Sequence, residues 1–153
     1  MENKIETPTN VDSESLGDSE STNDSVDYNT IITESFDDLN IKSNLLRGIY
    51  GTGYENPSAI QQKAIKPLID GRDLIAQAQS GTGKTATFSI GVLERIDETK
   101  NITQAVILAH TRELALQIEG VIKNLSTYMK IDVNLSVGGT TVRDNIDSLL
   151  KNP

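Results

Sequence analysis

The feature that most constrains this chain is a glycine-rich octapeptide, AQSGTGKT, at residues 78–85. A short apolar run precedes it and a stretch with helical spacing follows it, which is the context that a phosphate-binding loop requires. Gly81 and Gly83 let the backbone curl so that successive N–H groups face one anion, and the next helix N-terminus adds its dipole. The octapeptide begins with Ala where the consensus has Gly, and a plain glycine-rich turn is the alternative interpretation. Strand, helix and GxGKT core together favour a nucleoside-triphosphate site.

Each residue of the loop has an expected role. Lys84 is expected to reach the β- and γ-phosphates as a point charge, and the Thr85 hydroxyl to ligate Mg²⁺. These two are the candidate catalytic residues, and Thr85 is the candidate metal ligand. The other nucleotide-binding positions of the loop are Ala78, Gln79, Ser80, Gly81, Thr82 and Gly83. The loop by itself does not distinguish a helicase from a kinase, a GTPase or a transport ATPase.

Apolar runs alternate with segments of helical spacing over most of the chain. Helices are expected after Ser43, where Gly51 and Gly53 offer an end, and after Pro57-Ser58. Further helices are expected over 85–96, 112–125 and 142–150, and strands over 73–78, 104–109 and 134–139. Because strands that alternate with helices form βαβ units, this order predicts an α/β fold with a parallel sheet.

The charge of the chain is unevenly distributed. Nine of the 22 acidic residues but one of the 14 basic residues lie in residues 1–35, which leaves 13 of each in the remainder. With few apolar residues to offset the entropy of ordering, residues 1–33 are expected to form a disordered acidic tail, either solubilising or partner-binding. The folded domain is expected over 34–153. Its neutral balance provides no basic signature for nucleic acid and does not exclude a local one.

Composition excludes several classes of protein. The chain has no Cys, which rules out disulfides, thiolate nucleophiles and cysteine zinc sites. No segment approaches the roughly 20 apolar residues that span a bilayer, and the first residues lack the apolar run of a secretory signal. We therefore expect no membrane partner and a cytoplasmic location.

A second motif, GYENPSAIQ, lies upstream of the loop at residues 53–61, and Phe36 lies seventeen positions before its first residue. A local interpretation is available, because Ser58 and Gln61 have the S-x-x-Q spacing of a capping box. Phe36 taken alone would be a packing residue. On these residues alone, the capping interpretation is preferred.

Taken together, the motifs resemble those of DEAD-box RNA helicases, in the same order. GYENPSAIQ resembles the family's Q motif, AQSGTGKT its first helicase motif, HTRELA at residues 110–115 its motif Ia, and Gly138-Gly139 its GG motif. The resemblance covers the chain from about Phe36 onward. It implies a partial RecA-like P-loop domain that belongs to an ATP-dependent RNA helicase, with translation initiation as the setting and initiation proteins as possible partners.

The resemblance also implies roles for individual residues. Phe36 would stack on adenine, and Gln61 would hydrogen-bond the edge of the base, for which an amide offers both a donor and an acceptor. RNA, as a single strand or a duplex, would be bound without sequence specificity along Thr111, Arg112, Gly138 and Gly139. The implied cofactors are ATP and Mg²⁺.

The sequence departs from the family pattern in two ways. His110 occupies the position of a family Pro, and we assign it no role. The DEAD sequence itself, whose carboxylates serve Mg²⁺ and the attacking water in the family, does not occur in the 153 residues. We therefore expect this polypeptide alone to be inactive in hydrolysis. The alternative to a helicase part is a non-catalytic short form that binds ATP or a partner, while the Q motif and motif Ia argue against a different P-loop enzyme.

Overall fold

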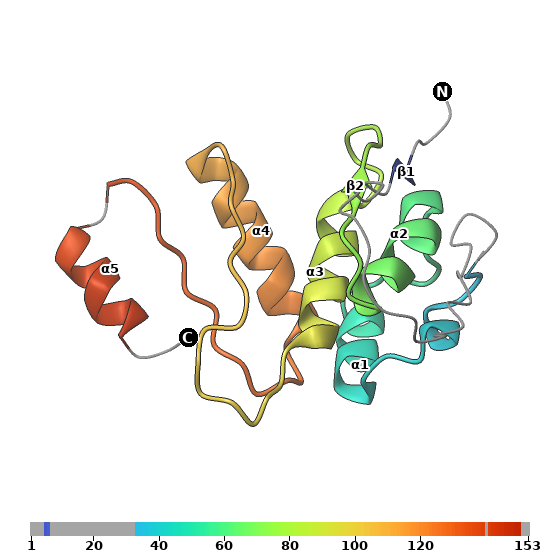
Figure 1. Cartoon of the computed structure of the whole chain (residues 1–153), viewed down its shortest axis with the longest axis horizontal. Coiled ribbons are helices and arrows are strands. Elements are labelled where there is room, and N and C mark those ends of the chain that lie inside the picture. The colour runs from blue at the N-terminus through green and yellow to red at the C-terminus, as the bar shows by residue number, and fades with distance from the viewer. Residues whose placement is uncertain (1–4, 7–32, 140, 151–153) are drawn as a thin grey trace, which may run out of the picture.

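The computed structural model describes residues 5–6, 33–139 and 141–150. Helices dominate this part of the chain (Figure 1). The 3-10 turn η1 spans Phe36–Leu39, and helices α1 to α5 span Ser43–Gly51, Ala59–Ile69, Lys84–Arg95, Arg112–Leu125 and Val142–Leu149. The two strands, β1 and β2, span Ile5–Glu6 and Ile75–Ala76. No helix of the described residues is long and apolar enough to cross a membrane.

The helix predictions are confirmed, and the helix ends follow from their capping residues. Ser58 is the N-cap of α2 and forms a capping box with Gln61. The Thr111 hydroxyl accepts a hydrogen bond from the Leu114 N–H at 3.2 Å and so caps α4. One detail differs from the prediction: Ser43 is the first residue of α1 rather than its cap, because Lys42 occupies the N-cap position.

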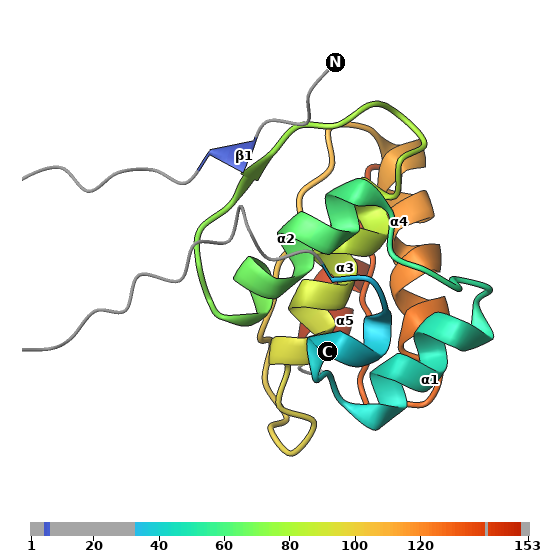
Figure 2. The same cartoon turned by 90° about the vertical axis from the view of Figure 1, so that its right-hand side faces the viewer.

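Helices α2, α3 and α4 run in the same direction, with their N-terminal ends at one end of the molecule (Figures 1 and 2). Gln61 near the start of α2 lies beside Gly83 at the start of α3, and Leu68 lies beside Gly91 further along. At the other end, the turn after α3 meets the turn after α4, where the Lys130 N–H donates to Glu98 Oε2 at 2.7 Å. The three helix N-termini therefore face the same side.

A mostly aliphatic core joins α1, α2, α3 and α4. Its fully buried members are Phe36, Leu45, Ile49, Ile65, Ile90 and Leu125. Gly48 lets α1 approach α4 very closely, since a Cβ placed there would lie 1.8 Å from the backbone oxygen of Leu125. Gly91 does the same for α3 against α2, where a Cβ would lie 2.6 Å from that of Leu68. These glycines set the spacing of the helical layer.

The predicted parallel sheet is absent from the described residues, which corrects the sequence-based expectation. Within 73–78 only Ile75–Ala76 form a strand, and they pair antiparallel with β1. Residues 104–109 and 134–139 are not assigned as strands. In the first of these segments Ile107 packs against the core, while its neighbours Val106 and Leu108 are 78% and 90% exposed. Apolar residues on both faces suit a strand in the middle of a sheet, and in this structure only one face is covered.

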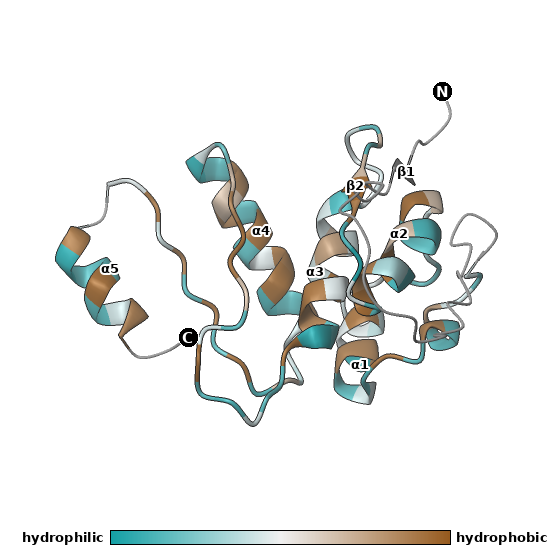
Figure 3. Ribbon diagram, viewed as in Figure 1, coloured by the Kyte–Doolittle hydropathy of each residue, from teal (hydrophilic) through white to brown (hydrophobic). Residues whose placement is uncertain are grey.

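These two extended segments line a largely apolar cavity of about 510 Å³ together with α3 and α4. Figure 3 shows hydrophobic colour along the segment that connects α3 to α4. The segments lie where an α/β fold would have its strands, without the backbone pairing that would make them a sheet. The fold is therefore the helical layer of an α/β domain, in which residues 104–109 and 134–139 are not assigned as strands.

Most of the expected tail, residues 1–33, lies outside the described residues. Within it, Ile5–Glu6 form the short strand β1, and the expectation of disorder stays a prediction. Thr33, at the other end of the tail, is 5% exposed and belongs to the folded part.

Candidate nucleotide- and RNA-binding site

The glycine-rich loop connects β2 to the N-terminus of α3. Gly81 has φ +81° and Gly83 has φ +93°, both in the left-handed region that other residues rarely adopt. The Thr82 hydroxyl donates to the carbonyl oxygen of Gln79 at 2.7 Å and closes the turn that contains Gly81. Lys84 and Thr85 follow as the first two residues of α3. The loop thus has the backbone form that its sequence predicts.

Lys84 is turned back onto the loop. Its ammonium donates to the carbonyl oxygens of Ala78 and Gln79, at 2.6 Å each. Backbone oxygens compensate the charge where a phosphate would otherwise do so. The ammonium group has three N–H donors, and these two oxygens engage two of them.

The upstream motif contacts the loop directly. The Ser58 hydroxyl donates to the carbonyl oxygen of Thr82 at 2.8 Å, and the Ser58 N–H donates to Gln61 Oε1 at 2.7 Å. A Cβ on Gly83 would lie 2.8 Å from Gln61 Nε2, so the amide lies against the backbone of the loop. Gln61 is 2% exposed. The structure therefore brings the two motifs together, and the capping interpretation of Gln61 is confirmed.

Sequence reasoning missed the hydroxyl of Ser58, which reaches a carbonyl of the loop. The S-x-x-Q spacing explains a cap on α2, and it gives no sign of a contact 24 residues away in the chain. The only sequence signal was that Ser58 lies in a motif which also carries Gln61. Its hydroxyl links the α2 N-terminus to the loop and belongs in the site.

Phe36 lies apart from this cluster. Its ring is 0% exposed and meets Tyr50 edge-on, with centroids 6.3 Å apart and an interplanar angle of 84°. The segment after η1 is anchored at the C-terminal end of α3, where the Lys42 ammonium donates to the Ile96 carbonyl at 2.6 Å. In this structure Phe36 is a core residue, and stacking on adenine requires one face of its ring to become exposed.

The four predicted RNA-binding residues form one exposed group. Arg112 Nη1 donates to the carbonyl oxygen of Gly138 at 2.7 Å across 26 residues of chain. Gly139 has φ +93°, and a Cβ there would lie 2.6 Å from the same nitrogen of Arg112. Thr111 precedes Arg112 and caps α4. Motif Ia and the GG pair, which are far apart in the sequence, are therefore adjacent in space.

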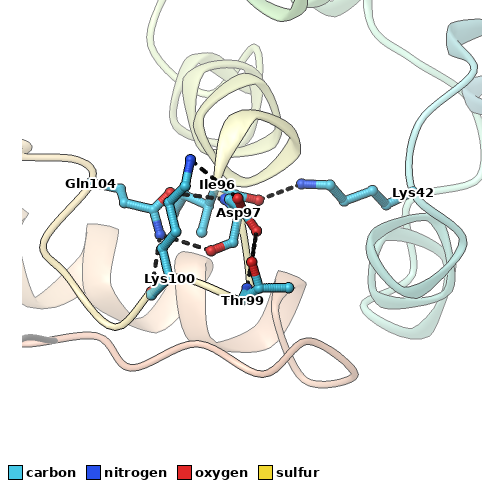
Figure 4. Close-up of polar contacts among 6 residues, drawn as sticks. All are labelled: Lys42, Ile96, Asp97, Thr99, Lys100 and Gln104. Carbon is cyan, nitrogen blue, oxygen red and sulfur yellow. Dashed lines mark hydrogen bonds and ion pairs between the residues drawn. The ribbon is translucent and has the colours of Figure 1, made fainter.

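The acidic residues near the end of α3 serve the structure. Glu94 Oε2 accepts from the Lys42 N–H at 2.8 Å. The Thr99 hydroxyl, at 2.6 Å, is the main cause that lowers the pKa of Asp97 to about 2, and the Thr99 N–H and Lys100 add to it. Figure 4 shows this network, in which Gln104 also holds the turn. These carboxylates lie at the opposite end of α3 from the phosphate loop, so they do not supply the missing catalytic groups.

The motifs described above are also found by comparison with known proteins. The family model of DEAD/DEAH box helicases matches residues 58–153, which include the loop, motif Ia and the GG pair. The chain belongs to the DEAD/DEAH box helicase family. The match begins at Ser58, so Phe36 and the first residues of GYENPSAIQ lie before it.

Individual relatives extend the likeness. An ATP-dependent RNA helicase eIF4A of Meyerozyma guilliermondii is 58% identical over 129 residues, which cover 80% of this chain and 33% of that protein. The chain thus spans about a third of the length of that curated relative.

Solved structures agree with this assignment. The RNA helicase Prp28 of Chaetomium thermophilum bound to ADP has a TM-score of 0.68 at 31% identity, covering 79% of this chain and 30% of that one. S. cerevisiae Dbp5 bound to RNA and ADP BeF3 has a TM-score of 0.64 at 37% identity, covering 72% and 30%. The RecA-like helicase domains of these proteins are therefore the fold to which this chain is similar.

Proposed function

We propose that this chain is the N-terminal, ATP-binding part of an ATP-dependent RNA helicase that acts in cytoplasmic translation initiation. The observation that carries the proposal is the contact between the upstream motif and the phosphate loop, against which Ser58 and Gln61 both lie. Family membership supports the activity, and the eIF4A relatives support the setting. Initiation proteins are the proposed protein partners.

The nucleotide is bound by charge, backbone and base recognition. The ammonium of Lys84 exchanges its two carbonyl partners for the β- and γ-phosphates. The N–H groups of the loop face the same phosphates at the N-terminus of α3, because the left-handed glycines turn the backbone inward. Gln61 has its Oε1 engaged by Ser58, which leaves its Nε2 as the group that meets an acceptor on adenine. Phe36 stacks on the base once its ring is exposed.

The residues at the start of α3 suit a divalent cation bound with the nucleotide. The Thr85 hydroxyl, in the first turn of α3 next to Lys84, is the group that would hold Mg²⁺. When bound, Mg²⁺ neutralises charge that develops on the phosphate oxygens. Thr85 would orient the cation, and Lys84 would supply a second positive charge beside it.

RNA is bound through its backbone at the group formed by Arg112 and the glycine pair. A guanidinium group offers paired N–H donors to a phosphate, and it does so without reading a base. The exposed backbone at Gly138 and Gly139 allows close approach of a sugar or phosphate. Single-stranded RNA and duplex RNA both present these groups, so we propose that recognition does not depend on sequence.

The nucleotide site is tested by titrating a fluorescent ATP analogue against variants of the chain. We expect Lys84→Ala to weaken affinity by at least tenfold, because a charge-assisted contact to phosphate contributes roughly 1.5–3 kcal/mol. Gln61→Ala is expected to reduce the preference for ATP over GTP. Lys63→Ala, which removes a lysine from the middle of α2, is the matched control and should bind as the parent does. Equal affinity of the Lys84→Ala variant and the parent would contradict the site.

The alternative is a non-catalytic short form that binds ATP or a partner. Both proposals expect ATP binding, and they differ in turnover. We expect a pure preparation of the 153-residue chain to bind ATP and show no RNA-stimulated phosphate release. Stimulated release above the level of a Lys84→Ala preparation would show that the chain hydrolyses ATP by itself.

A further inference from the structure

The ring of Phe36 is closed to a ligand in this structure. Phe36 is 0% exposed and belongs to the buried cluster that also contains Leu39, Leu45 and Ile49. A base stacks on an aromatic ring only where a face of that ring is accessible. The adenine-stacking role proposed above therefore requires a neighbour of Phe36 to give way.

Tyr50 is the neighbour that is best placed to move. It meets Phe36 edge-on with the ring centroids 6.3 Å apart, and it is 40% exposed. Leu39, Leu45 and Ile49 are between 0% and 2% exposed. A buried aliphatic side chain leaves a cavity when it moves, whereas a partly exposed ring at the C-terminal end of α1 can turn into solvent.

The residue that follows Phe36 anchors Tyr50. The Tyr50 hydroxyl donates to Asp37 Oδ2, and the Ser35 hydroxyl donates to the same oxygen at 3.0 Å. Ser35 is also the N-cap of η1, where its hydroxyl oxygen accepts from the Asp37 N–H at 3.2 Å. Tyr50 is therefore in contact with the ring of Phe36 and hydrogen-bonded to the next residue of the same turn.

We propose that Tyr50 is a positioning residue of the nucleotide site, which serves as the aromatic partner of Phe36 in the nucleotide-free chain and is replaced by adenine when ATP binds. Asp37 is its anchor. The proposal rests on the nucleotide site proposed above and adds a residue that sets the affinity for the base. Binding of the phosphates is left to Lys84 and the glycine-rich loop.

The direction of the effect follows from linkage. Affinity for a ligand that needs the exposed ring is reduced by the fraction of molecules in which the ring is exposed. Any contact that keeps Tyr50 on Phe36 therefore weakens ATP binding. We expect Tyr50→Leu, which removes both the edge-on contact and the hydroxyl, to tighten ATP binding by roughly two- to tenfold. Affinity for tripolyphosphate, which has three linked phosphates and no base, should be unchanged.

Isothermal titration calorimetry of the chain with ATP and with tripolyphosphate tests this difference. The matched control is Tyr128→Leu, because Tyr128 is 39% exposed and its ring contacts Arg47, at 4.0 Å, in place of Phe36. This control should bind both ligands as the parent does. Unchanged or weaker ATP binding by Tyr50→Leu would overturn the proposal. A change of equal size for both ligands would also overturn it, because a general loosening of the domain does not distinguish them.

Two milder variants test the anchor from either side. Tyr50→Phe keeps the ring and removes the hydroxyl, while Asp37→Ala removes the acceptor and leaves the sequence of α1 as it is. Each is expected to tighten ATP binding roughly twofold. The double variant should bind no more tightly than either single variant, because both changes remove the same hydrogen bond. Additive effects would refute Asp37 as the anchor of Tyr50.

The exchange of partners can also be followed directly by NMR. The chain has two Phe and four Tyr, so spectra of selectively labelled rings contain few signals. The nuclear Overhauser effect between the rings of Phe36 and Tyr50 should be present in the nucleotide-free chain. It should disappear at saturating ATP and persist at saturating tripolyphosphate. Its persistence with ATP would overturn the proposal.

The outcomes separate this proposal from the nucleotide site itself. If Lys84→Ala weakens binding of both ligands while Tyr50→Leu changes neither, the role of Tyr50 is refuted and the nucleotide site stands. If Lys84→Ala binds both ligands as the parent does, the phosphate site is refuted. The ring contact in the presence of ATP then still decides whether adenine replaces Tyr50.

Discussion

At the scale of single residues, Ser89 is a polar group without a partner. It is 0% exposed in the middle of α3, and its hydroxyl oxygen has no hydrogen-bond partner among the described residues. An unsatisfied buried hydroxyl costs roughly 1–3 kcal/mol, so Ser89→Ala should raise the free energy of unfolding by about 1 kcal/mol. The free energy of unfolding is measured by urea denaturation, followed by circular dichroism. The control is Ser126→Ala, since Ser126 is also buried and its hydroxyl does donate, to Lys123. A loss of stability in the Ser89 variant would contradict the prediction.

Asp97 gives a prediction for pH. Its pKa is lowered from 3.8 to about 2, chiefly by the Thr99 hydroxyl. Because the pKa is lower in the folded state, the contribution to stability is present above about pH 3.8 and is lost as the pH falls towards 2. Thr99→Ala should therefore raise the pKa of Asp97, as followed by NMR titration of its carboxyl carbon. If the pKa of Asp97 is unchanged in this variant, a group other than the Thr99 hydroxyl lowers it.

Sequence reasoning located most of the proposed site residues and could not place all of them. Gln61 was recognised as both a cap and a base-binding candidate, because the spacing and the motif use the same side chain. The contact of Arg112 with Gly138 depends on the path of the chain between them, which spacing does not reveal. The local interpretation of Phe36 as a packing residue agrees with its burial against Tyr50, whereas the adenine-stacking role implied by the resemblance stays a prediction.

At the scale of elements, Lys42 holds the C-terminal end of α3. Its ammonium donates to the carbonyl oxygens of Leu93, at 3.4 Å, and Ile96, at 2.6 Å, and also to that of Glu94. A cation at a helix C-terminus complements the helix dipole as well as the free carbonyls. Lys42→Met keeps the apolar stem and removes the charge, and it should lower the free energy of unfolding by about 1–2 kcal/mol.

The expected loss in the free energy of unfolding of Lys42→Met is measured by thermal and urea unfolding. Lys100→Met is the control, because Lys100 forms an exposed ion pair with Asp97 of a kind that contributes little. Equal effects of the two substitutions would mean that the carbonyl contacts of Lys42 add no stability. A larger loss for Lys42→Met than for Lys100→Met supports the role given to the helix end.

The helices were predictable and the strands were not, for a physical reason. A helix satisfies its backbone hydrogen bonds within its own segment, so the spacing and caps of 112–125 were enough to define α4. A strand is defined by a neighbour, and the run 104–109 has the composition of a buried strand without a paired neighbour in the described structure. The pairing that did form, between β1 and β2, uses a segment whose composition indicated disorder.

At the scale of the whole molecule, the segment at residues 104–109 leaves an apolar face uncovered. Val106 and Leu108 are large, apolar and mostly exposed, next to backbone without strand partners. Such edges promote pairing between copies. We expect Val106→Lys/Leu108→Lys to raise the monomer fraction at a given concentration, as measured by sedimentation velocity. The control is Arg143→Lys/Asp144→Glu on α5, in which two exposed side chains are replaced by others of the same charge. An unchanged monomer fraction in the first variant would place association elsewhere.

The common direction of α2, α3 and α4 has an electrostatic consequence at long range. Each helix N-terminus is equivalent to roughly half a positive charge, so three ends on one side give a field of about one and a half charges. This field belongs to the backbone, and neither pI nor side-chain counts record it. A domain with equal numbers of acids and bases thereby has a positive pole, which orients an approaching polyanion towards the end that carries the phosphate loop and Arg112. Such steering acts over about a Debye length and weakens as salt is added.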